Sequence, residues 1–219
     1  MQIFGHRGSG EGLGENTLVS FARAFDAGCV GVETDVRRCA DGSLVCSHEA
    51  VVGGYTVLST PYDVLATLGL VLLEDVLALA RGRGRVIIEI KNVAWEPDFD
   101  APDCASVIAL DALVTDVDDV VVSSFDFYSA EAARDRGLRT AHLTHPGVRP
   151  LAGIAYAGDA GLDEVHAWVG DVLAEPACVE QAHAAGLRLV AWTATTKDQL
   201  DQLSAIGVDG VITDVVGAL

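Results

Sequence analysis

Short runs of β-branched and apolar residues recur along this chain and alternate with stretches that have the spacing of amphipathic helices. Eight of these runs predict strands, at residues 3–7, 31–37, 85–91, 120–124, 139–143, 163–167, 188–193 and 210–213. Runs such as Val86-Ile87-Ile88 are apolar on both faces, which is typical of a parallel sheet covered by helices. The alternation therefore favours an α/β fold built from repeated βα units.

Helical spacing is found between the predicted strands. It covers residues 16–27, 73–80, 104–114, 128–136, 176–185 and 197–206. Gly137, Gly186 and Gly207 each stand just past one of these helices, where a left-handed cap is needed. Residues 44–48 predict a further extended piece after a turn at 41–42, and residues 60–63 predict a capped helix start.

Eight βα units in 219 residues fit a TIM (β/α)8 barrel better than an open sheet, because closure removes both edge strands. We expect residues 1–219 to form a single small TIM-barrel domain with a short insertion at about 50–72. Five residues follow Asp214, so the eighth helix is expected to be missing or a single turn.

The charge and composition exclude several classes of function. The formal net charge is −18, and lysine occurs only at Lys91 and Lys197. Such a field repels nucleic acid and anionic membranes, and it also makes a phosphate site depend on local positive charge or a metal. No long apolar stretch or secretory signal is found, which predicts a cytoplasmic protein without stable membrane insertion. The five cysteines lack CxxC spacing, which predicts buried free thiols.

Charged side chains gather where the first three predicted strands end, and TIM-barrel active sites lie at that end of the barrel. His6 and Arg7 close the first strand, and three carboxylates follow on the next two strands: Glu33, Asp35 and Glu89. Carboxylates on apolar strands are costly to bury unpaired, and a hard cation such as Mg²⁺ or Ca²⁺, or else Mn²⁺, would resolve that cost. Salt bridges to nearby bases are the alternative.

Two histidines and two cations complete the set of candidate catalytic groups. His6 and His48 are suited to proton transfer near neutral pH, one as acid and one as base; the alternative is that each is a hydrogen-bonded structural residue. Arg7 is suited to a two-point grip on phosphate, and Lys91 to neutralising a developing oxyanion.

The ordered motifs resemble the glycerophosphodiester phosphodiesterase family over nearly the whole chain. They are His6-Arg7-Gly8, Glu15-Asn16-Thr17, Glu33-Thr34-Asp35-Val36, Asp41-Gly42, His48-Glu49, Glu89-Ile90-Lys91, Ala191-Trp192-Thr193 and the segment 209–214. Gly14 replaces the proline usual before the second motif, and Glu49 replaces the aspartate usual after the second histidine. The insertion after that histidine is short here.

The resemblance implies a metal-dependent enzyme that hydrolyses a small glycerophosphodiester to glycerol 3-phosphate and an alcohol. Carried over, it assigns acid and base roles to His6 and His48, and phosphate contacts to Arg7 and Lys91. It assigns the metal to Glu33, Asp35 and Glu89. Trp192 would pack against the glycerol or alcohol, or else serve as a core aromatic. Glu15 and Asn16 would shape the first βα loop, with Glu15 near the metal or its water.

Two other functions are compatible with the sequence. One is a lysophospholipase D-like enzyme for acylated substrates, whose apolar rim would include Val51, Val52, Tyr55 and Val57. The other is a barrel that binds phosphate ligands without catalysis. His166, near the end of the sixth predicted strand, could also face the pocket. A homo-oligomer is possible.

Overall fold

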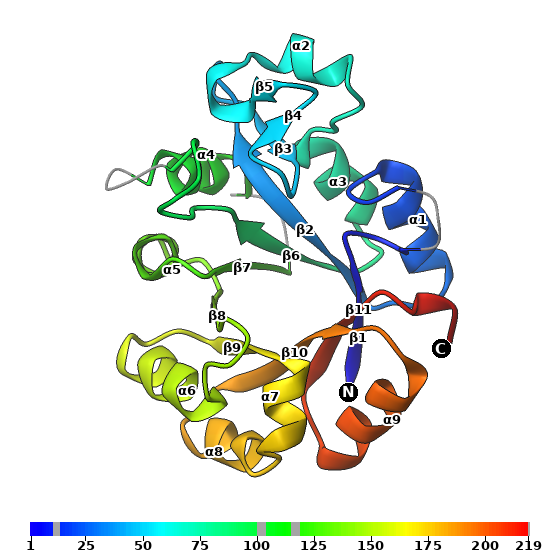
Figure 1. Ribbon diagram of the computed structural model, residues 1–219, viewed down its shortest axis with the longest axis vertical. Helices are drawn as coiled ribbons and strands as arrows, with labels where there is room; N and C mark the ends of the chain where they lie inside the picture. The colour runs from blue at the N-terminus through cyan, green and yellow to red at the C-terminus, as the bar shows by residue number, and fades with distance from the viewer. Residues whose placement is uncertain (11–13, 100–103, 115–118, 219) are drawn as a thin grey trace.

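A closed barrel of parallel strands forms the centre of the molecule (Figure 1). The computed structural model describes residues 1–10, 14–99, 104–114 and 119–218. Within these residues eight parallel strands follow one another around the barrel, and the last pairs with the first. They are β1 (Gln2–His6), β2 (Gly31–Arg38), β6 (Arg85–Ile90), β7 (Val120–Ser124), β8 (Thr140–Leu143), β9 (Glu164–Trp168), β10 (Arg188–Ala194) and β11 (Gly210–Thr213). The predicted TIM barrel is therefore confirmed.

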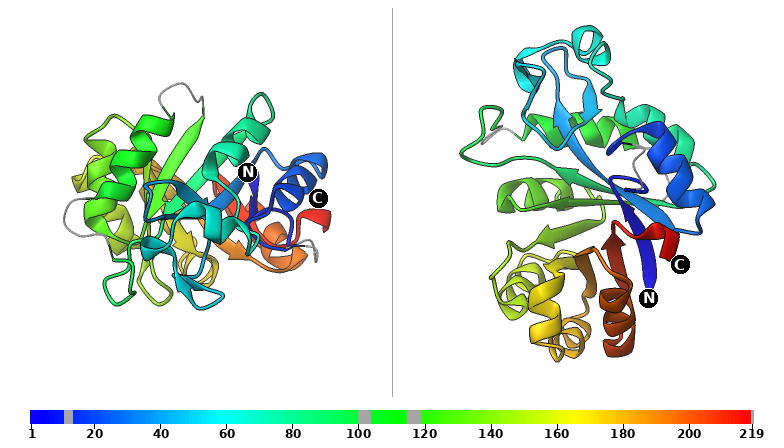
Figure 2. Two further views of the ribbon diagram at one scale, coloured as in Figure 1. Left: turned by 90° about the horizontal axis from the view of Figure 1, so that it is seen from above. Right: turned by 45° about the vertical axis from the view of Figure 1, so that its right-hand side comes forward.

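Helices cover the outside of the barrel (Figures 1 and 2). They are α1 (Leu18–Asp26), α3 (Leu73–Ala80), α4 (Ala105–Val114), α5 (Phe127–Arg134), α6 (Pro150–Asp159), α7 (Val169–Ala174), α8 (Cys178–Ala184) and α9 (Lys197–Ile206). The six helices expected from spacing are present, with some ends moved by one or two residues. Gly207, with φ of 82°, caps α9 as expected.

Two helices, α6 and α7, were missed in the sequence, and each has a physical reason. α6 contains Gly153 and Gly158, which lower helix propensity. Gly153 is required by packing, because a Cβ there would lie 2.4 Å from Cγ2 of Thr144. α7 has six residues, too few for a repeating apolar pattern. After β11 the described residues form the 3₁₀ turn η2 (Val216–Ala218), a single turn as expected.

Strand residues alternate between the barrel interior and the helices. Ile87 packs inside the barrel with Phe4 and Val190, whereas Val86 and Ile88 pack outward in the core beneath the helices. The strands are thus apolar on both faces, as expected for a parallel sheet. All five cysteines are buried and free, which confirms the prediction made from their spacing.

A small excursion follows β2 and rises above one side of the barrel (Figure 1). It contains β3 (Leu44–Cys46), which pairs antiparallel with β2, then β4 (Val51–Val52), β5 (Tyr55–Thr56), the 3₁₀ turn η1 (Val57–Ser59) and α2 (Tyr62–Ala66). The expected cap at the start of α2 is wrong, because the hydroxyl of Thr60 donates to the carbonyl of Thr56. The amide of Tyr62 instead donates to Asp41 at 2.9 Å.

No helix in the described ranges is both long and apolar enough to cross a bilayer.

Candidate active site

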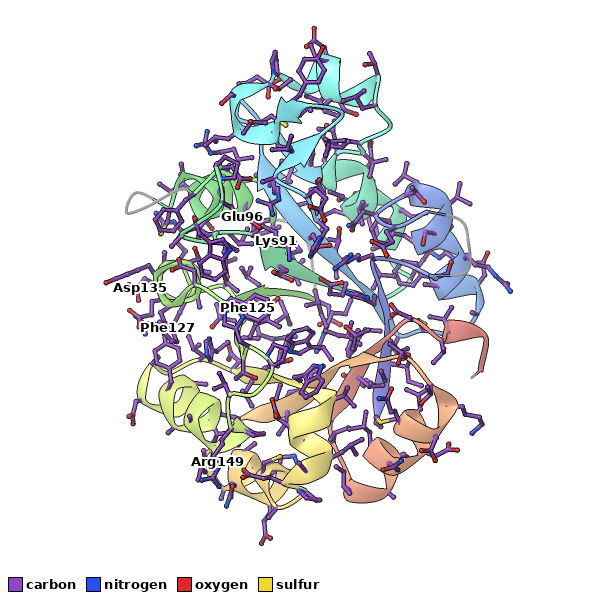
Figure 3. All side chains as sticks on the ribbon, viewed as in Figure 1. Lys91, Glu96, Phe125, Phe127, Asp135 and Arg149 are labelled. Carbon is purple, nitrogen blue, oxygen red and sulfur yellow. The ribbon has the colours of Figure 1, made fainter. Side chains whose placement is uncertain are left out.

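A pocket of about 540 Å³, counted with the solvent at its mouth, opens at the C-terminal ends of the strands. Half of its lining residues are ionisable, and the others are apolar or aromatic apart from Ser123 and Thr193. The lining residues are His6, Arg7, Glu33, His48, Glu89, Lys91, Ser123, Phe125, Leu143, Trp192, Thr193 and Ile212. In Figure 3, Lys91 and Phe125 lie toward the middle of the view, whereas Asp135 and Arg149 lie at its edge. The pocket thus joins seven of the residues singled out in the sequence.

Three buried carboxylates, those of Glu33, Asp35 and Glu89, form the charged side of this site. Each offers an oxygen, and these oxygens all lie within 4.8 Å of one another. Register explains the convergence, since Asp35 on β2 pairs with Glu89 on β6. Burial and the neighbouring carboxylates raise the pKa of Glu33, and burial also raises the pKa of Glu89. Three carboxylate oxygens this close together suit a hard divalent cation, so these residues fit the metal that the resemblance implies.

Two cations already contact the carboxylates. Lys91 Nζ lies 2.8 Å from Glu89 Oε1 and 3.1 Å from Asp35 Oδ1, and Arg7 Nε lies 2.9 Å from Asp35 Oδ2. Burial alone would raise the pKa of Asp35, but Lys91 and Arg7 outweigh it and the pKa is lowered. The salt bridges considered as an alternative to a metal are therefore present, yet three carboxylates still outnumber two cations.

The first βα loop supports Asp35 and Arg7. Asn16 is buried, donates from Nδ2 to Asp35 Oδ2 at 3.0 Å and accepts from the Thr34 hydroxyl at 2.8 Å. Glu15, expected near the metal or its water, is paired with Arg7: its Oε2 lies 2.7 Å from Arg7 Nη1. Asn16 thus holds a carboxylate of the triad in place, while Glu15 holds the guanidinium at the pocket wall.

His6 is held by a partner from the other end of the chain. Its Nδ1 lies 2.7 Å from Asp214 Oδ1, and its Nε2 lies 4.0 Å from Glu33 Oε2. Burial alone would lower the pKa of His6, but the hydrogen bond to Asp214 and the charge of Glu33 raise it. Sequence reasoning noted Asp214 in a motif and assigned it no role; the motif's place at the end of the last strand is the signal that could have found it.

His48 lies in the excursion after β3, and its side chain is 40% exposed. Its Nδ1 lies 2.8 Å from Oε1 of Glu49, the residue that departs from the family pattern. His48 and His6 line the same pocket from different elements, one from a loop and one from a strand end. The two expected proton-transfer residues are therefore brought together.

Two aromatic residues, Phe125 and Trp192, belong to the remaining part of the wall. Trp192 contacts Phe125 edge to face, with ring centroids 5.5 Å apart, and Phe125 stacks on His145 at 4.3 Å. Trp192 is part-buried and lines the pocket while also packing on the barrel core. His166 does not line this pocket: it is wholly buried, and its Nε2 lies 3.1 Å from Glu164 Oε2.

Comparison with known proteins decides the family. The model of the glycerophosphoryl diester phosphodiesterase family matches residues 6–96 and 70–218. The chain belongs to this family. The resemblance stated from the motifs is thereby confirmed, as are the enzyme class, a phosphoric diester hydrolase, and the reaction type, hydrolysis of glycerophosphodiesters.

Individual relatives in the family are distant but cover the whole fold. The glycerophosphodiester phosphodiesterase of Caldanaerobacter subterraneus subsp. tengcongensis is 26% identical over 238 residues, which cover 97% of this chain and 93% of that protein. The glycerophosphodiester phosphodiesterase structure from Thermotoga maritima superposes with a TM-score of 0.83 at 22% identity, covering 98% of this chain and 95% of that one. An Oleispira antarctica phosphodiesterase, solved with its product sn-glycerol-3-phosphate, has a TM-score of 0.84 at 19% identity and covers 99% and 94%.

Proposed function

We propose that this protein is a metal-dependent glycerophosphodiester phosphodiesterase that releases glycerol 3-phosphate and an alcohol through a pair of histidines, within a single catalytic domain. The observation that carries the proposal is that both histidines, two cations and two carboxylates, Glu33 and Glu89, line one pocket, with an oxygen of the third carboxylate, Asp35, within 4.8 Å of theirs. A structural salt-bridge network would need the paired charges but would have no need of two histidines facing an open cavity.

Glu33, Asp35 and Glu89 would hold the metal, which when bound would polarise the phosphoryl oxygens. Oxygen ligands favour Mg²⁺, Ca²⁺ or Mn²⁺. The raised pKa of Glu33 and of Glu89 supports this role, because both groups lie where added positive charge stabilises the ionised carboxylate. Asn16 keeps an Asp35 oxygen oriented through its hydrogen bond.

His6 and His48 would transfer the protons. The hydrogen bond to Asp214 leaves Nε2 of His6 directed toward Glu33 and the pocket, so that nitrogen would exchange a proton with the substrate. One histidine would take the proton of the nucleophile, either water or a glycerol hydroxyl, and the other would protonate the leaving alcohol. Arg7 and Lys91 would contact the phosphate. Their positive charge would offset locally the negative field of a chain whose formal net charge is −18.

Trp192 and Phe125 would pack against the carbon atoms of the glycerol or the alcohol. They form the apolar side of the same pocket and contact each other edge to face, which keeps that side rigid. Water would be excluded from this side of the substrate, which strengthens the electrostatic contacts on the charged side.

The test is hydrolysis of a panel of glycerophosphodiesters after chelation and after add-back of Mg²⁺, Ca²⁺ or Mn²⁺ separately. We expect no turnover after chelation and recovery with at least one metal. Ligands that raise the melting temperature without any hydrolysis across the panel would instead support the non-catalytic phosphate-binding barrel.

The lysophospholipase D-like alternative has partial support at the rim. Val51 and Tyr55 are 47% and 48% exposed, but Val57 is wholly buried in the core of the excursion, so its expected place on an apolar rim is wrong. Including acylated substrates in the same panel distinguishes this activity.

A further inference from the structure

A completely buried arginine lies at the end of β2, above the carboxylate triad. The side chain of Arg37 is 0% exposed, although it stands only two residues beyond Asp35 and on the same face of the strand. An arginine is almost never fully buried unless it is paired, so the groups that Arg37 contacts indicate its role.

The guanidinium of Arg37 joins two segments that flank the pocket. Its Nε and Nη2 donate to the backbone carbonyl of His48 at 3.2 and 2.6 Å. Its Nη1 lies 2.7 and 2.6 Å from the two oxygens of Asp98, and Nη2 lies 2.6 Å from Glu96 Oε2. Asp98 is itself buried and belongs to the segment after β6. One side chain therefore fastens the loop of His48 to the loop after β6.

The two pocket histidines are held in different ways. His6 belongs to a strand, and its ring contacts Asp214. The ring of His48 is on a loop and contacts Glu49, a side chain that is 74% exposed. Because Glu49 is so exposed, it restrains the His48 ring only weakly, and the position of the ring depends on the backbone of its loop. Besides the contacts of Arg37, the amide of Ser47 donates to the carbonyl of Asp35 at 2.9 Å.

We infer that Arg37 is the positioning residue for His48, acting through the His48 carbonyl rather than on the substrate. Three groups must be met at once: that carbonyl, Asp98 and Glu96. A planar guanidinium with five N–H groups can contact all three at once, whereas the compact ammonium group of a lysine cannot span them. Arg37→Lys thus keeps the buried charge beside Asp98 and releases the His48 loop.

The test rests on the proposed function and uses a double-mutant cycle with His48→Ala. A catalytic side chain misplaced by about 1 Å can lower the rate about 10²-fold, so Arg37→Lys should lower kcat for glycerophosphocholine on that order. In the His48→Ala background the same change should alter kcat less than about twofold, because the residue it acts through is gone. Equal losses in both backgrounds, or an unchanged kcat in the folded single variant, would overturn the assignment.

Arg85→Lys is the matched control. Arg85 is also a buried arginine paired with carboxylates, those of Asp119 and Glu164, but it stands at the opposite end of the barrel. Its substitution should lower the melting temperature and leave kcat unchanged. A kcat loss equal to that of Arg37→Lys would mean that any buried-arginine change disturbs the pocket, against the inference.

Two further measurements keep the test decisive. If Arg37→Lys does not fold, Arg37→Gln combined with Asp98→Asn removes both charges together and enters the same cycle. In proton NMR spectra, the Cε1–H signal of the His48 ring can be identified by its loss in His48→Ala. It should shift or broaden in Arg37→Lys, while the corresponding signal of His6 stays unchanged. That signal tests Arg37 even if the wild-type protein fails to hydrolyse glycerophosphodiesters, which would refute the proposed function alone. An unaltered His48 signal would count against Arg37.

Discussion

The barrel holds a largely buried cluster of charged side chains at each end, and the two clusters differ in charge balance. The pocket cluster contains Arg7, Glu33, Asp35, Glu89 and Lys91. The floor cluster, at the N-terminal ends of the strands, contains Arg85, Glu164, His166 and Arg188. Both pair arginine with carboxylates inside the same sheet, so the presence of such pairs does not separate a reactive site from a structural one.

The difference lies in which charge is in excess. In the floor cluster the one buried carboxylate, Glu164, meets Arg85 and Arg188 at 3.3 and 3.4 Å and His166 at 3.1 Å, and Arg85 also meets the exposed Asp119 at 2.8 Å. Burial alone would raise the pKa of Glu164, but these partners lower it. In the pocket cluster carboxylates outnumber cations, and the pKa of Glu33 is raised. A satisfied cluster stabilises the fold, whereas an unsatisfied one beside a cavity has capacity left for a ligand.

Substitution of the pocket histidines should have the largest effect on activity. His6→Ala and His48→Ala should each lower kcat by about 10²- to 10⁴-fold, the range typical of general acid or base catalysis. The melting temperature should change little for His48→Ala, because that side chain is 40% exposed. Steady-state kinetics with thermal melts check both points; near wild-type turnover by both variants would contradict the catalytic assignment.

Glu164→Gln should have the largest effect on stability. It removes the buried carboxylate that Arg85 and the part-exposed Arg188 share; loss of a buried partner costs up to about 3–5 kcal/mol, reduced here because Asp119 still contacts Arg85. For a chain of this size that is about 2–4 °C of melting temperature per kcal/mol. Activity should persist at temperatures where the variant is folded. A fall in kcat without a fall in melting temperature would erase the proposed distinction between the two clusters.

Glu33→Gln should show the reverse pattern. Loss of a residue that hydrogen-bonds to a metal ligand typically lowers metal affinity or activity by about 10–100-fold. Loss of the ligand itself should therefore lower activity by at least that factor. The melting temperature should stay constant or rise without added metal, because the raised pKa of Glu33 means that its charged form costs stability. Metal titrations monitored by activity and by melting measure both; a strongly destabilised Glu33→Gln would place this residue with the structural cluster.

The smallest effect concerns acid stability. Because the pKa of Glu164 is lowered from 4.5 on folding, its stabilising contribution is complete above that value and is lost as the pH falls through the lower folded pKa. Wild type should therefore lose melting temperature more steeply in acid than Glu164→Gln. Glu33→Gln should lose it more steeply than wild type, because wild type gains stability when Glu33, with its raised pKa, is protonated. Parallel acid profiles for wild type and Glu164→Gln would show that the floor pairing does not depend on this ionisation.

The sequence by itself determined the strand pattern, the barrel class and most of the pocket. Alternating apolar runs depend on neighbours a few residues apart, and charged residues such as Glu89 and Lys91 mark where a strand ends. A barrel then places every such end on one side, so the sequence by itself groups His6, Glu33 and Glu89.

The tertiary structure alone decided which of these side chains pair. Asp214 reaches His6 across 208 positions of sequence, and Arg37 reaches Asp98 across 61. The floor contact between Arg85 and Glu164 spans 79. Such pairs depend on the register with which the strands close and on the paths of the loops, and no local period encodes either. The sequence thus identified the groups at the pocket, whereas barrel closure determined their partners and so the charge left for a ligand.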